Sequence, residues 1–251
     1  CVDRQNVVNA VMLGQSSVPD TYIPASHPLF NPQATQWTYD PAAANALLDE
    51  IGWRDADNDP ATPRVAVNVT GVPDGTPLEM NYETTNALVR QQITQMVAES
   101  LAGCGIKINI ILHTANEWFA VGPHGPLYGR KYDLGEFAWL TGVIPPCDLF
   151  LSSEITGEGN NWTGQNSAGY SDPTFDIACN QQMQSLPGEP DYLQGVMEAQ
   201  RIFSEQLPVL PLFYRLKTAA ARPDLCGYAL DPTSSSDFWN IEAFDYGPGC
   251  K

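Results

Sequence analysis

Three aspartates at alternate positions form the most suggestive spacing of ionisable residues in this chain. Asp55, Asp57 and Asp59 match the first three oxygen ligands of a calcium-binding loop. The sixth position of such a loop needs glycine and the twelfth needs glutamate, but Pro60 and Ala66 stand there. These two departures favour a solvated acidic turn, with a calcium site as the weaker interpretation.

The sequence contains no motif that would carry catalysis. Gly-x-Ser-x-Gly, His-Glu-x-x-His and a glycine-rich phosphate loop are all absent from the sequence. The histidines His27, His113 and His124 are scattered over a predicted loop, a predicted strand and a second predicted loop. We therefore expect a protein that is not an enzyme and that needs no cofactor.

Aromatic and small residues end one predicted strand. In Asp133–Trp139, the two-residue period of a strand places Phe137 and Trp139 on the same side. Ligands of α/β sheets collect beyond the carboxyl ends of strands, where Trp139, Thr141 and Gly142 would lie. The alternative is that Trp139 belongs to the hydrophobic core.

A second candidate is the amide-rich loop at residues 160–166. Asn161, Trp162 and Asn166 combine amides with an indole, which suits uncharged polar ligands. A polar surface loop with capping asparagines is an equally good interpretation.

The elements that must position these residues begin with clear helix signals. Asp40-Pro41 combines an N-cap side chain with proline at the first helical position. The helix would bury a stripe of three residues and stop at Gly52: Leu47, Leu48 and Ile51. Asp172-Pro173 repeats the start signal, and we expect Phe175 and Ile177 to point inward.

Strands and helices alternate along the rest of the chain. Apolar residues at every second position predict strands at 65–69, 78–82, 106–112, 132–140, 209–214 and 218–221. Helical periodicity predicts helices at 84–103, 115–120, 146–152, 173–185 and 191–205, with a long loop at 14–38. Alternation of this kind predicts an α/β fold.

Composition excludes several classes of partner. With 29 acidic and 12 basic residues, the net charge of −17 argues against nucleic acid, whose phosphates need a basic surface. It also argues against electrostatic docking on anionic lipid. We interpret the chain as secreted or surface-exposed.

Four stretches together resemble a known family. They are the Asp3-Arg4 pair before an apolar helix, Tyr39–Trp53, Gly169–Asp176 and Gln206–Tyr214. In this order they resemble the second half of family 5 extracellular solute-binding proteins, the peptide, nickel and oligosaccharide receptors of ABC importers. The resemblance implies the C-terminal lobe of a type II, two-lobed periplasmic-binding-protein fold.

The resemblance also implies an organisation and a function. Residues 1–251 would form the C-terminal lobe, with the signal peptide and N-terminal lobe upstream of this chain. The protein would bind a peptide, oligosaccharide or similar small solute between two lobes, without catalysis. It would be an extracytoplasmic monomer, lipid-anchored in the full-length protein, with the ABC permease subunits as partners. The alternative is a secreted carbohydrate-active hydrolase.

The resemblance also bears on three of the candidate site residues. Peptide-binding members often follow the tryptophan with an aspartate that pairs with the amino group of the ligand. Here Thr141 and Gly142 occupy that neighbourhood, and the next acid is Asp148, which weakens the oligopeptide interpretation. Tyr214 resembles a ligand-contacting position, although a buried hydroxyl with internal hydrogen bonds would explain it equally well.

The six cysteines predict disulfides in an oxidising compartment. We predict that Cys147 pairs with Cys179, which would close a loop around the Gly/Asn-rich segment. Cys104 with Cys226 is a weaker prediction, and the two terminal cysteines, Cys1 and Cys250, would be free.

Overall fold

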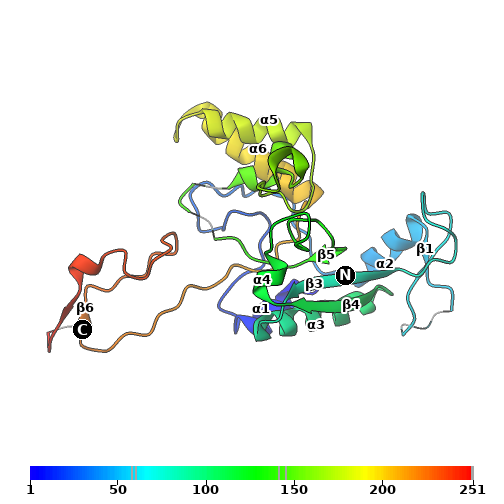
Figure 1. The fold of residues 1–251 in the computed structure, drawn as a ribbon, viewed down its shortest axis with the longest axis horizontal. Coiled ribbons are helices and arrows are strands. Elements are labelled where there is room, and N and C mark those ends of the chain that lie inside the picture. Colours follow the sequence, from blue (N-terminus) through cyan, green and yellow to red (C-terminus); the bar gives the residue numbers. More distant parts are fainter. Residues whose placement is uncertain (58, 60, 141, 145, 250–251) are drawn as a thin grey trace.

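The computed structural model describes residues 1–57, 59, 61–140, 142–144 and 146–249. A three-stranded parallel sheet in the order β4–β3–β5 lies at its centre (Figure 1). The strands are β3 (Glu79–Thr85), β4 (Lys107–His113) and β5 (Leu134–Gly135). Tyr82 of β3 is in register with Ile110 on one side and Leu134 on the other. The predicted strand at 132–140 is thus confirmed only at residues 134 and 135.

One face of this sheet is covered by two helices. α3 (Leu88–Ala102) connects β3 to β4, and α1 (Arg4–Val11) packs beside it (Figure 1). Ile93, Val97 and Leu101 of α3 form a core cluster with Val7 and Tyr82. The predicted helix at 84–103 is therefore present from residue 88 to 102, and Val89 near its start is exposed. A short helix, α4 (Ala115–Trp118), follows β4.

Asp40 caps the N-terminus of a helix, as predicted. α2 (Pro41–Glu50) begins after Asp40, whose carboxylate accepts a hydrogen bond from the Ala43 N–H. The predicted buried stripe is wrong, because Leu47 and Ile51 are exposed and Leu48 is only half-buried. Ala44 and Leu48 of α2 pack against the core cluster, and no residue of α2 is fully buried.

A short hairpin follows α2. β1 (Trp53–Arg54) pairs antiparallel with β2 (Val65–Ala66). The predicted strand at 65–69 ends early, since Asn68 has a left-handed φ of 58°, which strands do not accommodate.

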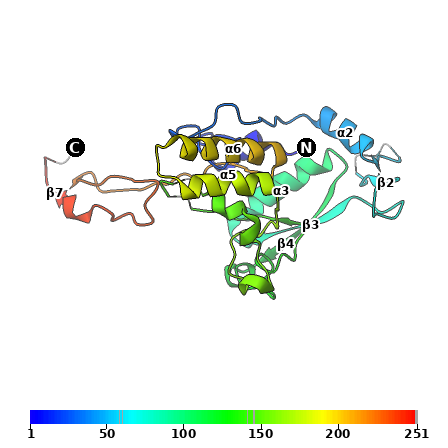
Figure 2. The ribbon, with the colours of Figure 1, turned by 90° about the horizontal axis from the view of Figure 1, so that it is seen from above.

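The second helical layer is a tight pair. α5 (Pro173–Gln184) and α6 (Pro190–Gln206) lie side by side in Figures 1 and 2. A Cβ at Gly195 of α6 would come within 2.6 Å of the Gln182 nitrogen, so only glycine permits this approach. Phe175 is fully buried, as predicted, but Ile177 is 68% exposed. Two residues along a helix turn the side chain by about 200°, so these two cannot share a face.

The chain after α6 differs from prediction. Residues 209–214 and 218–221 are not strands. Pro208 and Pro211 have no backbone N–H to donate to a neighbouring strand. In the described part of the chain, no strand pairs with either segment. This segment runs away from the sheet to the antiparallel pair β6 (Leu225–Cys226) and β7 (Asp245–Tyr246) (Figure 1).

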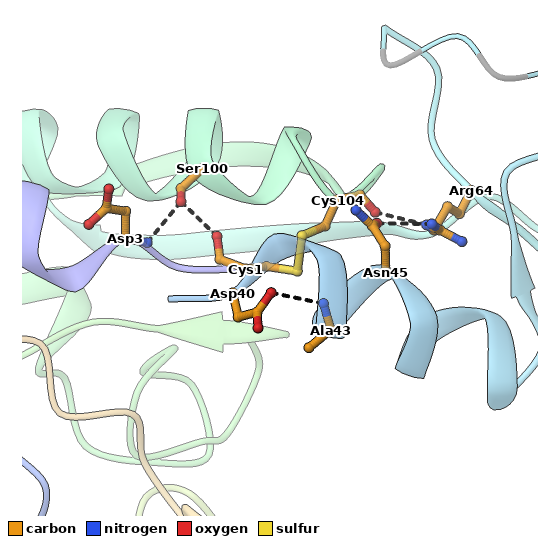
Figure 3. The surroundings of a disulfide bond; sticks show 8 residues. All are labelled: Cys1, Asp3, Asp40, Ala43, Asn45, Arg64, Ser100 and Cys104. Carbon is orange, nitrogen blue, oxygen red and sulfur yellow. Dashed lines mark hydrogen bonds between the residues drawn. A yellow bond between two sulfur atoms is a disulfide. The ribbon is translucent and has the colours of Figure 1, made fainter. Parts of the chain in front are cut away.

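Disulfides join segments that are distant in sequence. The predicted bond between Cys147 and Cys179 is present, with a Cα–Cα distance of 5.7 Å. The weaker prediction is wrong, because Cys104 is bonded to Cys1, which is therefore not free. Figure 3 shows the cause: the Ser100 hydroxyl donates to the Cys1 carbonyl and accepts from the Asp3 N–H, so α3 holds the chain start beside Cys104. Cys226 is also disulfide-bonded, and Cys250 lies outside the described residues.

Arg4 joins three irregular segments to α1. Its guanidinium donates to the carbonyl oxygens of Pro19, Trp37 and Pro211. The side chain is buried, and none of these acceptors carries a charge. Removing the donor would leave three carbonyls without this partner.

Replacing Arg4 by methionine is expected to lower the free energy of unfolding by about 3 kcal/mol or more, because buried carbonyls lose their donor. Urea denaturation followed by circular dichroism measures this change. Arg54→Met is the matched control, since Arg54 is half-exposed and its ion pair with Asp49 is long, at 3.6 Å. The control is expected to cost less than about 1 kcal/mol. Equal costs for the two variants would contradict the role given to Arg4.

Replacing Cys147 and Cys179 together by serine is expected to cost about 3–4 kcal/mol of stability, because the unfolded chain regains the freedom of the loop between them. Urea denaturation of the double variant measures the cost. Peptide mapping without reductant should recover the two cysteines in one linked fragment. A free thiol at either position would disprove the pairing.

Candidate functional site

The three parallel strands end at one edge of the sheet, which we call the carboxyl edge. It consists of the residues that follow β3 (86–90), β4 (114–121) and β5 (136–144). In parallel α/β sheets this is the edge where ligands collect, because the loops there are free to vary while the strands hold them in place. Phe137, Trp139 and Gly142 lie here, as predicted from sequence.

A buried carboxylate lies directly after β5. Glu136 accepts a hydrogen bond from the Tyr82 hydroxyl at 2.9 Å and pairs with the guanidinium of Arg90 in the first turn of α3. The Thr84 hydroxyl donates to the Glu136 carbonyl. Burial raises the pKa of Glu136, and Arg90 and Tyr82 offset part of this effect. The carboxylate therefore ties β3, β5 and α3 together at the edge.

A second carboxylate is paired near the end of β4. The His113 Nε2 lies 2.7 Å from Oε2 of Glu83, which is buried. The His113 ring stacks on Trp118 of α4, with ring centroids 5.6 Å apart and planes 16° apart. Glu83 and Glu136 are thus both hydrogen-bonded to basic side chains inside the protein.

The Phe137 and Trp139 rings pack edge to face beyond β5. Their centroids are 5.5 Å apart at an interplanar angle of 77°. Trp139 is 36% exposed, so it is not part of the buried core. A side chain at Gly142 would meet open space. Thr141 lies outside the described residues.

The residues predicted from the amide-rich loop make internal contacts. The Asn166 amide donates to the carbonyls of Leu151 and Tyr170, and its oxygen accepts from the Tyr170 N–H. Asn161 and Trp162 both adopt left-handed φ values, of 52° and 62°. The Trp162 ring covers Gly122, where an added Cβ would come within 2.3 Å of it. These contacts hold the loop in place and leave the polar atoms of Asn166 occupied.

Tyr214 is also held by internal hydrogen bonds. Its hydroxyl donates to the carbonyls of Ile23, at 2.9 Å, and Thr21, at 3.3 Å. Burial raises the pKa of Tyr214, so the hydroxyl stays protonated. The tyrosine fixes the 14–38 loop to the segment after α6.

The carboxylates of the acidic turn accept local hydrogen bonds. The Asp57 carboxylate accepts from the Asp59 N–H and the Thr62 hydroxyl, and the Asp59 carboxylate accepts from the Ala61 N–H. These hydrogen bonds lower the pKa of Asp57. Within the described ranges, no three His, Cys, Asp or Glu side chains come together as a metal site. Asp57 and Asp59 thus both accept hydrogen bonds from within the turn.

Sequence reasoning missed the charged pairs of the carboxyl edge. A signal was available in part: Glu83 directly follows the predicted strand at 78–82, Glu136 lies within the predicted strand at 132–140, and buried acids need partners. Their partners, His113 and Arg90, come from other elements. The pairing itself therefore depends on the sheet order.

Comparison with known proteins places the chain in a family. Residues 1–161 match the model described as bacterial extracellular solute-binding proteins, family 5, middle part. The chain is 31% identical over 211 residues to di/tripeptide-binding protein 2 of Pseudomonas aeruginosa strain UCBPP-PA14, covering 82% of this chain and 34% of that protein.

Solved structures agree with this result. The oligopeptide-binding protein of Thermus thermophilus, in complex with a pentapeptide, superimposes with a TM-score of 0.75 at 28% identity, over 90% of this chain and 38% of that one. The oligopeptide-binding protein AppA of Bacillus subtilis, in complex with a nonapeptide, gives a TM-score of 0.74 at 21% identity, over 98% and 45%. The α/β arrangement fits part of a lobe of the type II periplasmic-binding-protein fold, which confirms the predicted fold class.

The chain spans about a third of the length of the curated relative and less than half of each solved chain described above. Among the helices that the structure describes, none combines the length and apolar character needed to cross a membrane.

Replacing Arg90 by methionine is expected to cost about 3–5 kcal/mol at pH 7, because it leaves the buried Glu136 carboxylate without its cation. In this variant the folded-state pKa of Glu136 rises further above its unfolded value. The protein therefore keeps its stability at pH values below the unfolded pKa and loses it as pH rises through the folded pKa. Urea denaturation at pH 5 and pH 7 should show a smaller cost at pH 5.

Arg201→Met is the matched control for this experiment. Arg201 forms two exposed ion pairs, with Glu198 and Glu205 on the surface of α6. Its loss is expected to cost less than about 1 kcal/mol at either pH. A cost for Arg90→Met that does not depend on pH would contradict the role of Glu136 as the group left unpaired.

Proposed function

Because the chain belongs to family 5 of the bacterial extracellular solute-binding proteins, we propose that it supplies half of a receptor that captures a small solute for an ABC importer. The chain would be the C-terminal lobe over residues 1–251, and the solute would lie between this lobe and an N-terminal lobe. Short peptides are the first class to test, since the names of several relatives state peptide binding.

The observation that carries this proposal is the Phe137–Trp139 pair at the carboxyl edge. The two rings follow a parallel strand, pack edge to face and leave Trp139 partly exposed. Aromatic rings in the loop that follows a strand offer a large contact area for a ligand. We propose Phe137, Trp139, Thr141 and Gly142 as solute contacts. Asn161, Trp162, Asn166 and Tyr214, predicted from sequence, have a weaker claim because internal contacts hold most of them.

We propose binding without chemical conversion. The buried carboxylates of Glu83 and Glu136 are each hydrogen-bonded to a basic side chain, which supports binding rather than proton transfer to a solute. The hydrolase alternative has no support in the relatives described above, which are all binding proteins by name.

The remaining features of the proposal concern the whole receptor. Closure of two lobes about a hinge would bury the solute, as in other two-lobed receptors. The receptor would act as a monomer outside the cytoplasm, anchored by a lipid, and would deliver its solute to the permease subunits. One lobe provides about half of the contacts, so its own affinity should be weak.

Titration of this chain with trialanine, followed by NMR, tests the proposal. We expect millimolar binding, with shifts at the carboxyl edge that include the Trp139 indole. Trp139→Ala should weaken binding about tenfold or more, because it removes an aromatic contact.

Trp239→Ala is the control, since Trp239 is about as exposed but lies near β6 and β7. Micromolar affinity of this chain alone would contradict the half-site proposal. Hydrolysis of trialanine, or shifts only at other surfaces, would contradict solute binding at the carboxyl edge.

A further inference from the structure

The disulfide between Cys147 and Cys179 lies in the core of the second helical layer. Cys147 is 1% exposed and Cys179 is fully buried. Both belong to a core cluster that contains three aromatic rings, those of Phe150, Phe175 and Phe203. The bond closes the segment that carries the amide-rich loop at 160–166. Breaking it would remove one anchor of this segment to α5.

A methionine from the same helix reaches the sulfur of Cys179. Met183 follows Cys179 by four residues on α5, so the two side chains lie on the same face of the helix. The Met183 Sδ atom lies 3.8 Å from the Cys179 Sγ atom, so the two sulfurs are in contact. Met183 itself is 56% exposed. Its side chain therefore touches the buried disulfide on one side and water on the other.

Met183 differs from the other methionines in its exposure. All five methionines of the sequence lie in the described part of the chain, and Met183 alone is exposed. The other four are half-buried: Met12, Met80, Met96 and Met197. Oxidation of a thioether requires that the oxidant reach the sulfur, so exposure selects the site. The most accessible methionine is thus also the one in contact with a disulfide.

From this contact we infer that Met183 is an oxidation site and that its thioether protects the Cys147–Cys179 disulfide. A hydroperoxide that reaches the protein reacts at Met183 first, and the resulting sulfoxide opens the disulfide to thiol reductants. This role does not involve the carboxyl edge or any solute, so it is independent of the proposed function.

The first step is an oxygen transfer from the hydroperoxide to the thioether. A lone pair of the Met183 sulfur attacks one peroxide oxygen, and the O–O bond breaks. The departing hydroxide takes up the proton of the transferred oxygen and leaves as water. The sulfur is oxidised to the sulfoxide, and the peroxide is reduced. The side chain now carries a polar oxygen where it was apolar.

The second step is an exchange of thiol and disulfide. Burying the sulfoxide oxygen against an apolar cluster without a hydrogen-bond donor costs free energy, so the oxidised side chain turns toward water. A dithiol then reaches Cys179. Its thiolate forms a bond to the Cys179 sulfur, and Cys147 leaves as a thiolate. The second thiolate of the reagent displaces Cys179, which leaves both cysteines reduced and the reagent oxidised to its own disulfide.

A short exposure to hydrogen peroxide, followed by peptide mapping with mass spectrometry, tests the first step. We expect Met183 to become the sulfoxide at least about fivefold faster than any other methionine, because its sulfur is the most accessible. The other four methionines are controls within the same digest. Faster oxidation at any of them would overturn the assignment of Met183.

The rate at which dithiothreitol reduces each disulfide tests the second step. Released thiols are alkylated at intervals and identified by peptide mapping. Prior oxidation of Met183 should speed the reduction of Cys147–Cys179 about tenfold, because access limits attack on a buried disulfide. The Cys1–Cys104 bond follows α3 rather than α5, so its rate should not change. An unchanged rate at Cys147–Cys179, or an equal gain at both bonds, would overturn the inference.

Two substitutions at Met183 separate the cover from the sulfur. Met183→Leu keeps an apolar cover that peroxide does not oxidise, so reduction should stay slow with or without peroxide. Met183→Ala removes the cover and should give fast reduction without peroxide. Circular dichroism of each variant establishes that the fold is retained.

Met197→Leu is the matched control. Met197 is half-buried on the neighbouring helix α6, and its replacement should leave the response to peroxide intact. A peroxide response that survives Met183→Leu would overturn the role of the Met183 sulfur. Reduction of the Met183→Ala variant at the rate of the unaltered chain would overturn its role as a cover.

Discussion

The guanidinium of Arg4 lies where three segments without regular structure meet, and it holds all of them against α1 through their carbonyl oxygens. Burying the Arg4 guanidinium among uncharged carbonyl groups costs free energy. Its burial is therefore tolerated only when all three carbonyls accept its hydrogen bonds. Pro19, Trp37 and Pro211 thus take fixed positions together. Side-chain hydrogen bonds such as these, rather than strand pairing, hold the 14–38 loop and the start of the segment after α6.

A second buried polar side chain completes the path of that loop. Gln200 of α6 accepts from the Asn31 N–H and donates to the Leu29 carbonyl. Its oxygen also accepts from the Thr21 hydroxyl. A buried amide of this kind is favourable only when its groups are satisfied, so it selects a single arrangement of the loop. The loop in turn connects α6 to α1, which packs beside the sheet. It thereby links the two helical layers.

The carboxyl edge depends on the same principle of compensation. Glu136 and Glu83 lie buried beside the ends of the strands, and each is tolerated because Arg90 or His113 is within reach. These pairs fix the start of α3 and the turn after β4. Loops rather than strands then carry Phe137 and Trp139.

The sequence by itself determined the starts of α2 and α5 and the α/β class. The caps at Asp40 and Asp172 act on N–H groups two or three residues away, so no distant segment can change them. Tertiary structure alone decided that residues 209–214 are not a strand, that Leu47 faces water, and that the Asn166 amide turns inward. Each of these depends on a partner from elsewhere in the chain: a neighbouring strand, a covering helix, or the carbonyls of Leu151 and Tyr170. Local hydrogen bonds are encoded within a few residues, whereas burial and pairing are set by whichever distant segments the fold brings together.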